Sequence, residues 1–423
     1  MTRARWIAAA VGGCVMLTAL VWIAAAIAAG RQIEATLREE LRAPERPAGL
    51  QLIGLEHHSG WLSSRGSAEL RIAMGCGPQN RARAPLFHVE YRFEHWPWWQ
   101  GPVRFEARAQ PISAFGEDLR ALAGEDHVVQ ANGVQDYQGV SRVQLRVPAR
   151  TLRKPHGTLE LAEAEGQIVV QGEALSIEFQ QPRLYVETRG WQAEARDLTL
   201  AWKLRDRHKG VGSTQTHAAV LNSSFGAADG IAIQTRGAEL GGRVELHLNA
   251  HAQRLVQSGH TLHDAQFQAD ASGLHAESWA ALTRQARADC SLIALAADPS
   301  NAVRNGARGL MEHGFSLAIS KLTARSDDGS MNAELNLEMR PAPGKLELAT
   351  QLRSIGQITL LGPSLMNAGQ QHFPLRPFLK PIPGGLRASY AFDNGALTVN
   401  DKAWSPLLVR IALNMFDSAL LAL

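Results

Sequence analysis

The chain has 423 residues, of which 45% are hydrophobic, 20% charged and 6% aromatic, so it has room for one to three domains and the composition of an ordinary folded protein. Its formal charge is +3, from 43 basic and 40 acidic residues, and this balance argues against a dedicated nucleic-acid binder. Its 3 cysteines exclude a disulfide framework and a protein with several zinc sites.

The first part of the chain is an uncharged segment, residues 6–30, that follows Arg3 and Arg5. A helix of about 20 apolar residues crosses the hydrocarbon core of a membrane. We therefore predict a cytoplasmic stub and transmembrane anchor at residues 1–30, followed by a juxtamembrane helix at residues 31–46. The large C-terminal part favours a single-pass protein of the inner membrane with its body in the periplasm.

A cleaved signal peptide is the alternative interpretation of this segment. The residues Ala26-Ile27-Ala28 resemble a small-residue cleavage site. In an oxidising compartment Cys76 and Cys290 could form a disulfide, but they are far apart in the sequence and their spacing decides nothing.

The body, residues 47–364, is a long series of short segments that alternate apolar and polar residues. Alternation with a period of two gives each strand one apolar and one wetted face. Turn signals such as Asp327-Asp328-Gly329 and Asp393-Asn394-Gly395 separate these segments, as in an antiparallel meander. We expect strands at residues 66–73, 87–95, 103–110, 141–149, 157–164, 175–181, 184–190, 197–204, 243–250, 265–271, 315–324, 331–339, 345–354 and 390–400.

Few segments have helical spacing. We expect helices at residues 32–42, 277–287 and 301–313, and an apolar C-terminal helix at residues 406–423. Residues 365–423 then comprise a Pro/Gly-rich linker, a closing hairpin and that last helix, which either packs on the sheet or contacts a membrane surface or a partner. The fold class is mostly β with a few helices: an N-terminal transmembrane helix followed by an extended, curved antiparallel β-sheet body.

Common catalytic signatures are missing from the sequence. There is no H-E-x-x-H motif, no phosphate-binding loop and no G-x-S-x-G elbow. The segment Gly210-Val211-Gly212 lacks a third glycine and is predicted to be a loop. Among the 15 histidines, His251, His260, His263 and His275 have spacings that can bind zinc or copper, but no evident ligand set is completed, and surface or turn positions are the simpler interpretation. We expect no metal, no cofactor and no catalytic residue.

The most unusual segment is residues 94–101, EHWPWWQG. Its Trp96, Trp98 and Trp99 bring a large apolar area close together, next to His95. The tryptophans could cap the end of a β-core, bind a flat or acyl ligand, or enter a membrane interface. These four residues are the candidate ligand or interface residues.

Four short patterns resemble the YdgA-like family of bacterial envelope proteins, domain of unknown function 945. They are the anchor with residues 30–34 and 58–64; the strand that ends at His95, where a Gly of the family pattern is replaced by Trp96; residues 273–279; and the closing hairpin at residues 390–400. The resemblance implies an inner-membrane anchor and a β-rich periplasmic body. It implies no reaction, cofactor or catalytic residue.

The function that we expect is non-enzymatic binding of lipid-like or apolar ligands in the cell envelope, because a sheet with one apolar face needs that face covered. The alternative is an envelope scaffold or assembly factor that acts through protein contacts. A metallohydrolase that uses a histidine cluster has the least support. The expected partners are the inner membrane, through the N-terminal helix, and a lipid or protein in the envelope.

Overall fold

The computed structural model describes residues 50–59, 63–72, 86–94, 103–113, 127–136, 138–155, 157–188, 191–223, 226–257, 260–289, 301–341, 348–366 and 378–405. These residues are mostly β-strand with few helices, as expected, and their strand pairs run antiparallel. The helices expected at residues 1–46 and 406–423, and both Cys76 and Cys290, lie outside the described residues. Within the described ranges, no helix is long and apolar enough to cross a membrane.

The described residues divide into two compact units. The first contains the residues up to Arg207, together with residues 215–223 and the end of helix α5. The second contains residues 208–214, 226–284 and the described residues from Asn301 onward. The strand β12 (Val211–Ser223) is therefore shared between the two units.

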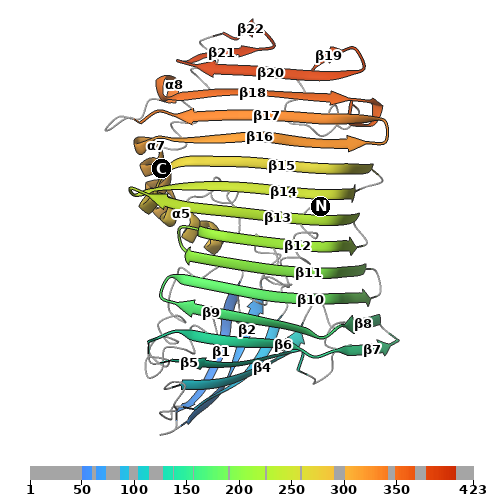
Figure 1. Ribbon diagram of the computed structural model, residues 1–423, viewed down its shortest axis with the longest axis vertical. Coiled ribbons are helices and arrows are strands. Elements are labelled where there is room, and N and C mark those ends of the chain that lie inside the picture. Colours follow the sequence, from blue (N-terminus) through green and yellow to red (C-terminus); the bar gives the residue numbers. More distant parts are fainter. Residues whose placement is uncertain are drawn as a thin grey trace. The chain divides into compact units, whose positions relative to one another are not determined.

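The first unit is an antiparallel sheet with the order β1-β2-β3-β4-β5-β6-β9-β10-β11, in which β8 also pairs with β10, and β7 with β8. Within this unit β1–β4 run obliquely to β9–β11 (Figure 1). The strands are β1 (Leu50–Ser59), β2 (Ser63–Ile72), β3 (Leu86–Glu94), β4 (Val103–Ser113), β5 (Val129–Gln135), β6 (Ser141–Val147), β7 (Arg150–Lys154), β8 (Gly157–Leu161), β9 (Ala164–Gln171), β10 (Ala174–Thr188) and β11 (Trp191–Asp206).

One face of this sheet forms the core of the first unit. Alternate residues of β2–β6 and β9–β11 meet in a single apolar cluster, with Phe93, Val143 and Ile168 completely buried. Tyr91 belongs to the same face, and its hydroxyl hydrogen-bonds the ring of His57 at 3.1 Å and donates to the carbonyl oxygen of Glu56 at 3.3 Å. Burial raises the pKa of Tyr91 to about 12, so this hydroxyl keeps its proton at neutral pH.

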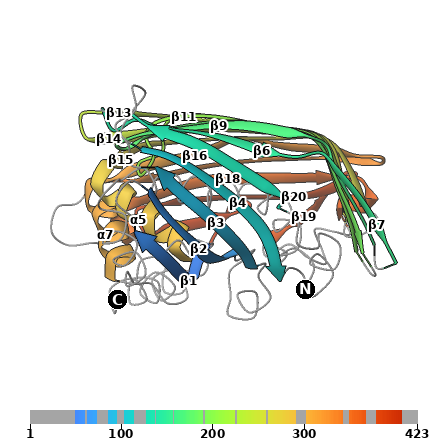
Figure 2. The ribbon, with the colours of Figure 1, turned by 90° about the horizontal axis from the view of Figure 1, so that it is seen from below.

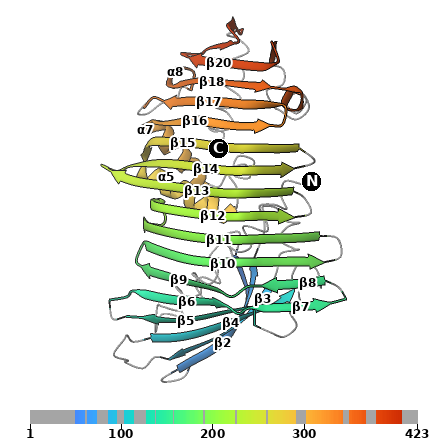
Figure 3. The same ribbon diagram turned by 45° about the vertical axis from the view of Figure 1, so that its right-hand side comes forward.

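The strands of the second unit pair in the antiparallel order β13-β14-β15-β16-β17-β18-β20-β21-β22, and Figure 3 shows the run from β13 to β18 and β20. The strand β19 pairs with the other half of β20. Its elements are β13 (Gly226–Leu240), β14 (Arg243–Gln257), β15 (His260–His275), α5 (Ala276–Asp289), α7 (Asn301–His313), β16 (Phe315–Ser326), β17 (Gly329–Met339), α8 (Leu348–Gln351), β18 (Leu352–Leu361), β19 (Lys380–Ile382), β20 (Gly385–Asp393), β21 (Ala396–Val399) and β22 (Lys402–Ala403).

The helices α5 and α7 lie on one face of the strands of this unit (Figure 2). Both were expected from helical spacing, and the observed bounds of α7 match residues 301–313. The two helices approach closely because α7 presents glycines to α5. A Cβ atom on Gly306 would come within 3.0 Å of Leu282 and of the backbone of Ser278, and one on Gly309 would overlap the Ser278 side chain.

Several local predictions differ from the structure. The segment 345–354 was expected to be a strand, but Leu348–Gln351 is the helix α8 and β18 begins at Leu352. The pairing of β17 with β18 is consistent with this boundary, because Met339, the last residue of β17, pairs with Leu352. Gly210 is in a turn as expected, but Val211 already begins β12. The separate strands expected at 175–181 and 184–190 are one strand, β10.

Candidate functional site

The four candidate residues from the sequence, His95, Trp96, Trp98 and Trp99, lie outside the described residues. They directly follow β3, which ends at Glu94. Their role as ligand or interface contacts therefore stays a prediction. The described residues offer two other surfaces, one charged and one apolar.

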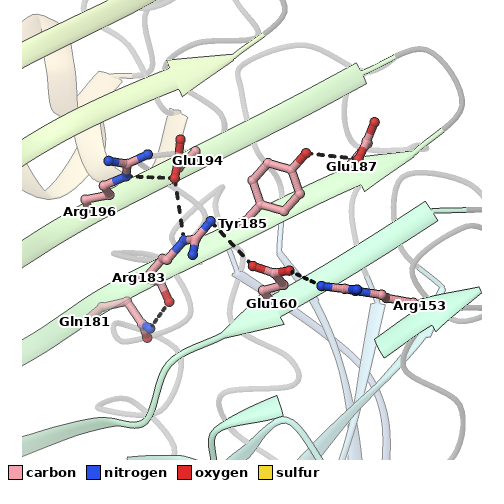
Figure 4. Close-up of polar contacts among 8 residues, drawn as sticks. All are labelled: Arg153, Glu160, Gln181, Arg183, Tyr185, Glu187, Glu194 and Arg196. Carbon is pink, nitrogen blue, oxygen red and sulfur yellow. Dashed lines mark hydrogen bonds and ion pairs between the residues drawn. The ribbon is translucent and has the colours of Figure 1, made fainter. Parts of the chain in front are cut away.

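The first surface is a charged cluster of seven side chains on β7, β8, β10 and β11 (Figure 4). Glu194 lies at its centre, with a side chain only 9% exposed, and it accepts a hydrogen bond from Arg196 Nε at 2.7 Å. The Nε atom of Arg183 lies 3.5 Å from the same carboxylate oxygen. The members of the cluster are Arg153, Glu160, Arg183, Tyr185, Glu187, Glu194 and Arg196.

Arg183 connects the two halves of this charged cluster. Its Nη2 atom lies 3.4 Å from Glu160, which also holds Arg153 at 3.3 Å. Its guanidinium carbon lies 6.0 Å from the centre of the Tyr185 ring, within the range of a cation–π contact. The Tyr185 hydroxyl donates to Glu187 at 2.9 Å, and this bond raises the pKa of Tyr185.

The charged cluster lies beyond a break in the alternation of β10 and β11. Before the break, Ile177 and Phe179 are buried on β10, but after it the buried residue is Val186. Pro182 has no N–H to donate to the ladder, and the opposite residue, Asp197, has a φ of 50°. Together these two residues interrupt the alternation of buried and exposed side chains. The odd-numbered residues of β10 face the core before the break and point to solvent after it, as Arg183 does.

Gln181 satisfies the backbone at this break. Its side chain is buried, and its amide nitrogen donates to the carbonyl oxygens of Arg183, at 2.7 Å, and Ala162, at 3.1 Å. The position is where β10 changes partner from β9 to β8. A buried amide at this junction supplies the hydrogen bonds that the interrupted ladder lacks.

The charged cluster contributes little to stability, because its arginines remain half exposed. The side chains of Arg183 and Arg196 are 50% and 52% exposed, so both keep most of their water. We expect Glu194→Gln to lower the free energy of unfolding by less than about 1 kcal/mol. Urea denaturation measures this change, with Glu163→Gln as the matched control for an ion pair that Arg146 makes elsewhere in the unit. A loss above about 2 kcal/mol would mean that the arginines are held away from water.

This cluster was not expected from the sequence, although the sequence contains a signal for it. The apolar positions of β10 jump from Phe179 to Leu184, and those of β11 jump from Ala195 to Leu198. Both jumps interrupt the period-two alternation, and they occur at positions of β10 and β11 that pair with each other. The ion pairs themselves depend on which strands become neighbours, which a single strand does not show.

The second surface is an apolar strip in the second unit. It consists of side chains on β14–β17 that are half-buried and belong to none of the apolar clusters of the described residues. Cross-strand pairing puts them in neighbouring rows: Leu248 and Ile319 both pair with Ala269, Ile319 with Leu335, and Leu317 with Leu337. The apolar strip is Leu248, Phe267, Leu317, Ile319, Leu335 and Leu337.

Both ends of the apolar strip have a covered neighbour on the same face. At one end, Ala276, Trp279 and Leu282 of α5 and Leu310 of α7 pack on Val244, Leu246, Ala271, Leu274 and Phe315. At the other end, Leu365, Met366, Phe378 and Leu379 pack on the ends of β17, β18 and β20. Beside the strip, Ser354 and Tyr390 join their hydroxyls at 2.8 Å. The strip is therefore the less covered middle of a continuous apolar face.

The opposite face of these strands is polar. His247 hydrogen-bonds Asp270 at 2.6 Å, and His263 hydrogen-bonds Asp327 at 3.1 Å. Of the other histidines singled out in the sequence, His260 is exposed at the start of β15. His275, directly before α5, stacks on His313, the last residue of α7. Among the described residues, no group of three or more His, Cys, Asp or Glu side chains is placed to hold a metal ion.

These surfaces define a mostly β protein whose large antiparallel sheet has a charged cluster in one unit and a partly covered apolar face in the other. Comparison of the sequence with protein families adds its family. Residues 7–360 match the family described as bacterial protein of unknown function (DUF945), and the chain belongs to this family. This confirms the resemblance to domain of unknown function 945 found in the sequence. No curated protein and no solved structure matches the chain significantly.

Proposed function

We propose that this protein is anchored in the inner membrane by its N-terminal segment and that its body binds lipid-like or apolar ligands in the periplasm without transforming them. The apolar strip carries the proposal. It offers six large apolar side chains on one face, all half-buried, between the covered clusters at its two ends.

The dimensions of the apolar strip suit a long, narrow ligand. Neighbouring strands of a sheet lie about 4.8 Å apart, so the four strands that carry the strip span roughly 14 Å. The rows also contain small residues, including Ala250 and Ala269, which leave room between the larger side chains. An extended acyl chain that crosses the strands can contact several rows at once, which a compact polar ligand cannot.

The membrane part of the proposal is supported by the sequence. Residues 6–30 are uncharged and long enough to cross a membrane, and they precede the described body. A body held close to a membrane would meet lipids at high local concentration. The tryptophans at positions 96, 98 and 99 belong to the other unit and are separate candidate contacts for a ligand or an interface.

Ile319→Asp is the substitution that tests this function. A carboxylate in the middle of the apolar strip would lose its water when an acyl chain binds, so we expect lipid affinity to fall by at least about tenfold. The full chain is extracted in mild detergent, and the lipid bound per chain is quantified by mass spectrometry. The wild-type protein is expected to retain stoichiometric lipid, and the variant to lose it.

Ile355→Asp is the matched control, because the chain offers the same substitution on the opposite face. Ile355 is 47% exposed and pairs with Asn336 on the polar side of β17 and β18. This variant is expected to retain the lipid of the wild type. Equal losses in both variants, or a wild-type protein without bound lipid, would contradict the proposal. A stoichiometric protein partner without lipid would support the scaffold instead.

A further inference from the structure

Four residues where α5 meets α7 form a closed ring of contacts. His275, directly before α5, stacks on His313, the last residue of α7, with 3.9 Å between ring centroids and 10° between ring planes. His275 Nδ1 hydrogen-bonds the Ser278 hydroxyl at 2.9 Å. His313 Nδ1 donates to the carbonyl oxygen of Gly309 at 2.8 Å, and Gly309 lies directly against Ser278. We name these four residues the histidine latch.

The histidine latch joins the start of one helix to the end of the other. Leu310 of α7 and Ala276 of α5 are buried against Val244 and Leu274, beside the apolar strip. Trp279 of α5 donates its indole N–H to the carbonyl oxygen of Lys209 at 3.0 Å. Whatever loosens the latch therefore loosens the cover at one end of the strip.

A positive charge on His275 has unfavourable surroundings. From α7, the facing titratable group is His313; from β14, it is Arg243, which donates to the carbonyl oxygen of Gly273 at 3.2 Å. Glu277, on α5 itself, is the acidic group that acts on His275. The start of a helix also disfavours a cation, because the peptide dipoles place positive charge there.

Two further ion pairs lie on the elements in contact with the latch. On α7, Glu312 pairs with Arg308 at 3.9 Å. On the segment that binds Trp279, Lys209 pairs with Glu239 at 3.1 Å. The charge balance at the stacked rings is therefore set by the two histidines, Arg243 and Glu277.

We propose that the histidine latch is an acid-sensitive switch: protonation of its stacked imidazoles separates α7 from α5 and uncovers that end of the apolar strip. Two imidazolium rings stacked face to face repel each other, and Arg243 adds to the repulsion. The switch as such rests only on the latch geometry, whereas its use in controlling ligand access rests on the proposed function.

The direction of the pH effect follows from proton linkage. Burial, then the nearby charges of His313 and Arg243, lower the pKa of His275 below its ordinary value of 6.5. The open state therefore binds a proton more readily than the closed state. Closure has its full stability at pH values above the ordinary pKa and loses stability as the pH falls through and below it.

Hydrogen exchange measured on the full chain in detergent tests the switch. Protection factors, corrected for the intrinsic pH dependence of exchange, are compared at pH 7.5 and 5.0 for the amides of α5 and α7. One linked proton allows opening to increase by at most about tenfold per pH unit. We expect a loss of protection of between about threefold and thirtyfold in the wild type, confined to these helices.

His275→Asn and His313→Asn are the variants that each remove one of the stacked imidazoles, and each keeps a side chain that can hydrogen-bond. In His275→Asn the protection of α5 and α7 is expected to be independent of pH over this range. In His313→Asn the loss of protection is expected to be smaller than in the wild type, because burial and Arg243 still act on His275. His247→Asn is the control, because His247 bonds Asp270 on the polar face; it should keep the pH effect of the wild type. Unchanged protection of the wild type at pH 5.0, or the same loss in the latch variants, would overturn the switch.

The same samples separate the switch from the proposed function. Lipid bound per chain is measured at both pH values. Exchange that depends on the histidine latch, in a protein without lipid at either pH, would leave the switch standing and contradict the lipid proposal. Stable lipid binding, together with protection of α5 and α7 that does not change with pH, would support the lipid proposal and contradict the switch.

Discussion

Phe93→Ala is expected to destabilise the first unit by about 3–5 kcal/mol, the cost of emptying a large buried aromatic site. The Phe93 side chain is 0% exposed. Its ring lies 5.3 Å from that of Tyr91 on its own strand and 6.4 Å from that of Phe105 on β4, measured between ring centroids. Because Phe93 pairs directly with Phe105, the loss removes a contact at the centre of the cluster and leaves a cavity that the sheet cannot close.

Urea denaturation, followed by hydrogen exchange of β2–β6, measures this loss in the unit where it occurs. The matched control is Leu240→Ala, a truncation of a side chain that is 82% exposed. The control is expected to stay within about 0.5 kcal/mol of the wild type. A cost below about 1 kcal/mol for Phe93→Ala would show that the described cluster is not the core of this unit.

Gly329→Ala is expected to destabilise the second unit by about 1–3 kcal/mol. Gly329 follows the turn Asp327-Asp328, and a Cβ atom there would overlap the carbonyl oxygen of Leu361 on β18. It would also lie 2.6 Å from the Leu361 carbonyl carbon and 2.8 Å from Gly362 Cα. All three atoms belong to the backbone, so the strand itself must move. Thermal unfolding together with hydrogen exchange of β16–β18 measures the result.

Gly54→Ala is the control for this substitution. The nearest atoms to a Cβ on Gly54 lie 3.8 Å away, in the flexible side chain of Glu69. The change is expected to stay within about 0.5 kcal/mol. If both alanine variants behaved alike, the close approach of the β16–β17 turn to β18 would not be a feature of the folded protein.

The same turn also shows how a sequence signal can be correct yet incomplete. Asp327-Asp328-Gly329 was expected as a hairpin turn, and it joins β16 to β17. The sequence does not reveal that Asp328 also accepts hydrogen bonds from the backbone N–H and the hydroxyl of Ser364, both at 2.9 Å. These bonds, with one from Ser326, lower the pKa of Asp328. Besides joining β16 to β17, the turn therefore binds the backbone at Ser364, which lies far along the chain.

The segments whose secondary structure differs from the expectation have a common physical cause. Alternation is a property of one strand, whereas a strand forms only where a neighbour is available. Residues 345–354 alternate, but within their described part the pairing of β17 with β18 begins at Leu352, after the helix α8. Conversely, β12 and β13 contain so many small and polar residues that their alternation is faint, and only the completed sheet makes them strands.

The sequence alone determined that this protein is mostly β and antiparallel, because period-two alternation and turn residues act locally. Its family followed from the match of residues 7–360. The sequence also determined α5 and α7. Only the tertiary structure decided which apolar side chains stay half-buried and where the alternation of β10 and β11 is interrupted. It also decided that His275 stacks on His313, which lies 38 residues later in the sequence. These features depend on which strands and helices become neighbours in space, and that is fixed by the packing of the whole unit.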